Sequence, residues 1–101
     1  MSLPDEYRDL VAAYVESLEP VAQSLAAWAR RLEAEGVGVQ EIRELAHKLA
    51  GNGASFGFPE ITEGAKRVTE SARLLREDGG SAAEVVAHAR SLINTLRAAT
   101  V

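Results

Sequence analysis

The sequence predicts an all-α protein: an up-down antiparallel four-helix bundle with an additional N-terminal helical segment. Hydrophobic residues make up 47% of the 101 residues but aromatic residues only 5%. This composition favours closely packed helices over a sheet, because strands are enriched in β-branched and aromatic side chains. Apolar residues recur at spacings of three and four, the period of one helix face. Short breaks separate these stretches, so consecutive helices should be antiparallel neighbours.

The length corresponds to one small domain, which we place at residues 1–101, with an N-terminal helical segment over 1–19 and the four-helix bundle over 20–99. Such a chain buries one modest core and has no room for a separate nucleotide-binding domain. Its formal charge is −4, so it lacks the basic footprint expected of a nucleic-acid or anionic-lipid partner. Cysteine is absent, and no apolar run approaches the ~20 residues of a membrane span. Because the acidic N-terminus does not resemble a signal peptide, we expect a cytoplasmic protein.

The first half of the chain carries one continuous apolar stripe at helical spacing, formed by Leu3, Tyr7, Leu10, Tyr14, Leu18, Val21, Leu25, Trp28 and Leu32. Ser2 and Pro4 indicate a helix start. Pro20 interrupts the stretch without changing its phase, so a kink or break is expected near Glu19–Pro20. A straight helix of this span would measure about 45 Å, much longer than the later helices. We therefore expect the N-terminal half to bend over the bundle of a monomer rather than pair with a second copy.

Three further helices are predicted after Gly36 and Gly38. The first should run from about Val39 to Ser55, with a core stripe formed by Val39, Ile42, Leu45, Ala46, Leu49 and Gly53. Pro59 suits the first turn of the next helix, which Asp78, Gly79 and Gly80 should end. Ser81 and Glu84 form a capping-box pattern that opens the last helix.

His47 falls almost opposite the core stripe of its predicted helix, because each residue turns about 100°. The positions beside it on that face are Ala50, Gly51 and Ala54, and Arg43 lies one turn earlier. An exposed imidazole should therefore rise from a nearly bare helix surface beside a cation. Glycine inside a helix costs about 1 kcal/mol relative to alanine. We interpret Gly53, on the core side, as a packing residue and Gly51 as clearance for a partner; the simpler alternative is an ordinary surface histidine.

The segment from Ala46 to Gly57 resembles the signature of histidine phosphotransfer (HPt) domains. That signature is His-x-Leu-Lys-Gly-Ser-Ser with a glycine ten residues after the histidine. Identical residues stand at His47, Leu49, Gly51 and Gly57, and small residues at Asn52 and Gly53. The predicted helices match the family's bundle over nearly the whole chain. Ala50 departs from the pattern, since the family usually has lysine there.

The resemblance implies a phosphocarrier without ATP-binding or autokinase activity. His47 would accept a phosphoryl group from a receiver-domain aspartate and pass it to another receiver. Its partners would be response-regulator receiver domains and hybrid histidine kinases, and Mg²⁺ would be held only by the receiver, with no cofactor or metal on this chain. The alternatives are a non-catalytic HPt-like adaptor and a helical-bundle interaction module.

With Ala50 in place of lysine, another cation should meet the phosphoryl charge. Arg43 is the best placed, Lys66 on the following helix is a second candidate, and Lys48 points about 100° away around its helix. The resemblance also assigns Thr69 to the position of a polar side chain that hydrogen-bonds the histidine ring.

Two other patterns carry less weight. Residues Gly53 to Gly57 match G-x-S-x-G, but that nucleophile elbow needs a preceding strand, and none is predicted. His88 has no ligand motif around it, so we interpret it as a solvated surface histidine rather than as half of a metal pair with His47.

Overall fold

In a computed structural model that describes residues 5–100, the chain forms five α-helices and one short 3₁₀ helix. They are α1 (Asp5–Glu16), α2 (Leu18–Glu35), α3 (Val39–Asn52), η1 (Ala54–Phe56), α4 (Pro59–Glu77) and α5 (Ala82–Ala99). No strand occurs within residues 5–100, which confirms the all-helical prediction. The predicted helix start at Ser2 and Pro4, and the first stripe residue Leu3, lie outside the described residues.

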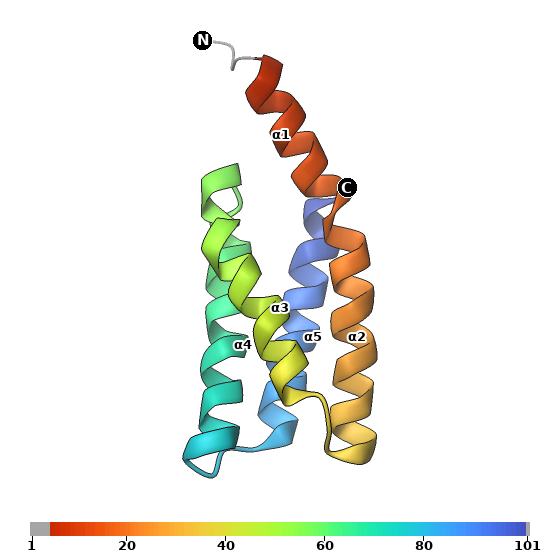
Figure 1. Ribbon diagram of the computed structural model, residues 1–101, viewed down its shortest axis with the longest axis vertical. Helices are drawn as coiled ribbons and strands as arrows, with labels where there is room; N and C mark the ends of the chain where they lie inside the picture. Colours follow the sequence, from red (N-terminus) through yellow and green to blue (C-terminus); the bar gives the residue numbers. More distant parts are fainter. Residues whose placement is uncertain (1–4, 101) are drawn as a thin grey trace.

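Figure 1 shows α2, α3, α4 and α5 side by side, with successive helices running in opposite directions. Helix α4 packs between α3 and α5, and α2 packs mainly against α5. The core lies among these helices and contains mostly Leu, Ile, Val and Ala side chains, among them Leu18, Leu25, Ile42, Ile61, Val68, Leu92 and Leu96.

The first helical stretch breaks at Ser17, three residues before the expected position at Pro20. Pro20 is the third residue of α2, within the first turn, where a backbone N–H has no intrahelical acceptor. Its ring would clash with the carbonyl of Glu16 if the helix continued, and Glu16 is the last residue of α1. The proline therefore starts α2 rather than kinking one long helix.

Helix α1 extends beyond the bundle and leans over the connection between α3 and α4 (Figure 1). Tyr14 is buried there and stacks on Phe56, with ring centroids 4.5 Å apart. The Tyr7 hydroxyl donates a hydrogen bond to the Ser55 carbonyl oxygen at 3.0 Å. By contrast, Leu10 keeps 58% of its surface exposed. Thus two of the three apolar residues in α1's part of the stripe contact the rest of the chain.

The connection between α3 and α4 is tighter than the sequence suggested. We expected α3 to reach about Ser55, but it ends at Asn52 because the Ala54 N–H leaves the helix ladder and donates to Thr62 Oγ1 at 2.8 Å. The short helix η1 follows and ends at Gly57, whose φ of 91° is a left-handed conformation that suits glycine. The boundaries predicted from Pro59, Asp78 and the Ser81 cap are confirmed.

Candidate functional site

His47 lies on the third turn of α3 and is exposed, on the side of the helix away from its buried residues Ile42, Ala46 and Leu49. Within residues 5–100 its ring forms no hydrogen bond or ion pair. The imidazole is therefore free to meet a group brought by another molecule.

The surface around His47 is shallow because the neighbouring side chains on this face of α3 are small. Apart from its chain neighbours and the backbone of its own helix, nothing in residues 5–100 lies within 4 Å of a Cβ added at Gly51, and Ala54 is exposed. A Cβ added at Gly53 would instead lie 2.9 Å from Thr62 Oγ1 and 3.1 Å from Ile61 Cβ. The two glycines thus differ as the helical wheel suggested: Gly53 allows α4 to pack closely, whereas Gly51 faces open space.

Two hydrogen bonds define how α3 lies along α4. Near the start of α3, the Arg76 guanidinium donates to the side-chain oxygen of Gln40. At its end, the Ala54 N–H donates to Thr62 Oγ1. From the first pair to the second, the residue on the α3 side advances in the sequence by as many positions as the residue on α4 goes back. The antiparallel register between these two pairs is therefore regular.

This register places Thr69 level with His47 and Lys66 level with Ala50. The Thr69 hydroxyl donates to the carbonyl oxygen of Ala65 at 2.9 Å, so its hydrogen is used within α4. Its oxygen lone pairs remain able to accept from a ring N–H. Lys66 is exposed on α4 opposite the position where a lysine is missing from α3.

The cations around the face differ in their partners. Arg43 is half-buried, and no carboxylate lies within 4.0 Å of it in residues 5–100; nearby Glu44 accepts instead from Gln40. Arg73 pairs with three acids, Glu70 at 2.7 Å and also Glu77 and Asp78. The hydrogen bond from Arg73 lowers the pKa of the Glu70 carboxyl. Of these two arginines, only Arg43 is unpaired.

Lys48 lies on the other flank of α3, where it lines a pocket together with residues of α1 and α2. Lys48 is exposed, but it does not share the small-residue face of His47.

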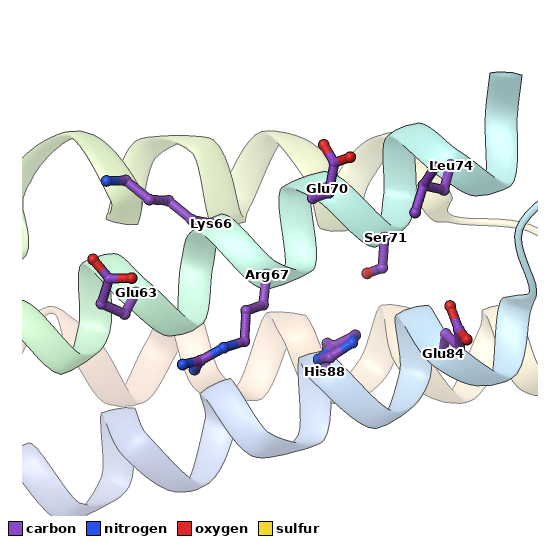
Figure 2. A pocket seen from close by; sticks show the side chains of 8 residues that line it. All are labelled: Glu63, Lys66, Arg67, Glu70, Ser71, Leu74, Glu84 and His88. Carbon is purple, nitrogen blue, oxygen red and sulfur yellow. The ribbon is translucent and has the colours of Figure 1, made fainter. Parts of the chain in front are cut away.

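A groove of about 310 Å³ lies between α4 and α5. Figure 2 shows Arg67 extending from α4 toward α5, beside His88, whereas Lys66 points away from α5. His88 is partly exposed and lines this groove, so it is a surface histidine that is less solvated than one on an open helix face. The residues next to His88 in the sequence do not reveal the groove, because two helices form it. Among residues 5–100, no three His, Asp or Glu residues gather as a metal site would require.

The G-x-S-x-G pattern lies on η1 and its flanking turns, after a helix rather than a strand. The aromatic contacts of Phe56 and Phe58 with Tyr14 explain this segment structurally. They were missed in the sequence because Tyr14 is more than 40 positions away, and helical periodicity reports only local neighbours.

The fold and the site together define a small helical module that presents an exposed histidine on a face of small side chains. The family model of the Hpt domain matches residues 9–99, and the chain belongs to this family. The match starts within α1 and ends at the last residue of α5.

Hpt domains are phosphocarrier modules of two-component phosphorelays and interact with receiver domains. No curated protein and no solved structure matches the chain. No helix within residues 5–100 combines the length and the apolarity that crossing a membrane requires.

Proposed function

We propose that this chain carries a phosphoryl group on His47, taking it from a receiver-domain aspartate and giving it to another. The observation that carries the proposal is the exposed imidazole on a face where Gly51 leaves open space. A receiver with its aspartyl phosphate could approach such a surface closely. Partners would be response regulators and hybrid histidine kinases.

The chemistry requires little beyond this geometry. A neutral imidazole carries one ring nitrogen without a proton, and that nitrogen is a nucleophile. That nitrogen attacks the phosphorus of the aspartyl phosphate, a P–N bond forms, and the P–O bond to the aspartate breaks, releasing a carboxylate. The reverse exchange loads the next receiver. Positioning and charge neutralisation provide most of the catalysis in such transfers.

Supporting roles follow from the register. Arg43 and Lys66 would offset phosphoryl charge, and Thr69 would orient the ring by accepting from its N–H. We also propose that no metal is held by this chain and that it transfers phosphate without autokinase activity. Helices α2–α5 would form the up-down bundle of a monomeric module, with α1 as the additional N-terminal segment.

Incubation with a phosphorylated cognate receiver tests the proposal. Wild type should acquire an acid-labile, alkali-stable phosphoryl group and His47→Gln should not, whereas His88→Gln should label like wild type. Equal labelling of wild type and His47→Gln would refute the role of His47. Receiver binding without any labelling would instead indicate the adaptor function.

A further inference from the structure

Arg73 on α4 stands level with Arg43 on α3. The two hydrogen bonds between these helices fix a regular antiparallel register. Residues three or four apart share a helix face, so the facing sides of α3 and α4 meet at successive levels. Between the two hydrogen-bonded pairs these levels are Arg43 with Arg73, His47 with Thr69 and Ala50 with Lys66. Three cations therefore lie within about one turn of the His47 level.

The three cations differ in their acidic partners. The Arg73 guanidinium donates to both carboxylate oxygens of Glu70, at 3.0 and 2.7 Å, so its planar fork matches the carboxylate. It also lies 3.2 Å from a carboxylate oxygen of Glu77. Among residues 5–100, no carboxylate lies within 4.0 Å of Arg43 or Lys66. The acidic side chains of this region are thus gathered on one cation of the three.

The register puts Glu70 near both unpaired cations. On α4, Lys66 precedes it by four residues, and residues four apart on a helix are neighbours. Across the contact, Glu70 is level with Ala46, which is one turn from Arg43. The axes of packed helices lie about 8–10 Å apart, a distance that long Arg and Glu side chains can span together. Figure 2 shows Glu70 and Lys66 pointing away from α5, whereas Arg67 extends toward it.

We propose that Arg73 is a positioning residue of the phosphocarrier. It holds the Glu70 carboxylate away from Arg43 and Lys66. Both cations thereby stay free for a phosphoryl group on His47. The inference rests on the proposed function and adds a residue that acts through these two cations rather than on the phosphoryl group. Without Arg73, Glu70 would pair with one of them, and a cation whose charge is already balanced offsets less phosphoryl charge.

Loading of the full chain with phosphoramidate, followed by phosphorus NMR, tests the effect on the phosphohistidine. Arg73→Gln should shorten the lifetime of the phosphoryl group on His47 about two- to fivefold, the range of a surface ion pair. Adding Glu70→Gln should restore the lifetime, because the competing carboxylate is gone. Arg90→Gln is the matched control: Arg90 is also ion-paired, with Glu33, and its loss should leave the lifetime unchanged. A double variant as short-lived as Arg73→Gln would overturn the inference, because Arg73 would then act on the phosphoryl group directly.

Titration of Glu70 in the unphosphorylated chain tests the competition itself. The hydrogen bond from Arg73 lowers the pKa of the Glu70 carboxyl in the wild type. In Arg73→Gln this pKa should stay below its ordinary value, because Arg43 or Lys66 takes up the carboxylate. Adding Arg43→Ala and Lys66→Ala should return the pKa to its ordinary value. Carboxyl carbon shifts in NMR measure it.

The titration also separates this inference from the proposed function, because it needs no phosphoryl group. An ordinary Glu70 pKa in Arg73→Gln alone would show that neither cation competes for the carboxylate, and the role of Arg73 would be refuted. Failure of wild-type His47 to take up phosphate would instead refute the proposed function.

Discussion

Gly53 lies so close to Thr62, where α3 meets α4, that a Cβ added at Gly53 would stand only 2.9 Å from Thr62 Oγ1. The same Thr62 oxygen accepts the hydrogen bond of Ala54 that ends α3. One close contact therefore determines both the length of α3 and the approach of α4. The His47 face is held in place by a packing contact on the opposite side of its helix.

Gly53→Ala should destabilise the protein. The φ of −54° at Gly53 is open to alanine, so the cost arises from the contacts with Thr62 and Ile61 rather than from the backbone. Overpacking of this kind costs about 1–3 kcal/mol. Gly51→Ala is the control. Its Cβ contacts no other element of the described residues 5–100, and the substitution should stabilise the protein by about 0.4–1 kcal/mol. Urea unfolding would measure the free energy of unfolding of both variants. Equal values for Gly53→Ala and Gly51→Ala would contradict the packing role of Gly53.

Gly51→Gln should slow phosphotransfer without loss of fold. Glutamine is a good helix former, and Gly51 is exposed on α3, so stability should not fall. Its side chain would stand one turn from His47, where a receiver must approach. Transfer rates from several phosphorylated receivers should drop, while Gly51→Ala transfers nearly like wild type. Unchanged rates for Gly51→Gln would show that receivers do not use this clearance.

Tyr14→Ala should release α1 from the bundle. The substitution removes the stack on Phe56 and the contact with Phe58, and loss of a buried aromatic ring costs about 3–5 kcal/mol. Leu10→Ala is the control, because an exposed side chain contributes within about 0.5 kcal/mol. Sizing should give a monomer for both variants and for wild type. A wild-type dimer that Leu10→Ala dissociates would show that this face pairs with a second copy.

The sequence predicted most of the fold because helix signals are local. Gly36, Pro59 and the Ser81 cap lie at the boundaries they predicted, since each acts through its own backbone or its nearest turn. The exposure of His47 also followed from helical phase alone. The end of α3 did not, because the hydrogen bond from Ala54 to Thr62 joins two helices.

The features that were missed share this non-local origin. Tyr14 and Phe56 meet only after α1 leans over the hairpin, and neither spacing nor composition reports that contact. The helix breaks at Ser17 and not near Pro20, as expected, because of how proline fits a helix. A proline marks a helix boundary, but it can stand inside the first turn as well as at the break.

The hydroxyl of Tyr14 should titrate above its ordinary pKa of about 10. Burial raises this pKa, so the folded state retains a proton that the unfolded chain releases. The resulting stability is fully present below about pH 10 and is lost as the pH rises through the folded pKa. In Tyr7→Phe, Tyr14 is the single remaining tyrosine, so ultraviolet absorbance reports it alone. A midpoint at or below about pH 10 would contradict burial of the hydroxyl.

Arg43 should partly replace the lysine that is missing at Ala50. A transferred phosphoryl group carries up to about two negative charges, which a nearby guanidinium can offset. Among residues 5–100, no carboxylate lies within 4.0 Å of Arg43, so its guanidinium is free to serve this charge. The face is exposed, and a surface ion pair contributes at most about 1 kcal/mol, or roughly fivefold.

We therefore expect Arg43→Ala to lower the transfer rate and the phosphohistidine lifetime about two- to fivefold, with unchanged folding stability. Adding Ala50→Lys should largely restore both, because residues three apart on a helix are neighbours and the new ammonium group would stand beside His47. Lys66→Ala reports the contribution from α4, and Lys48→Ala, on the other flank, should have no effect. If Arg43→Ala transfers and holds phosphate like wild type while Lys66→Ala does not, the compensating charge lies on α4 instead.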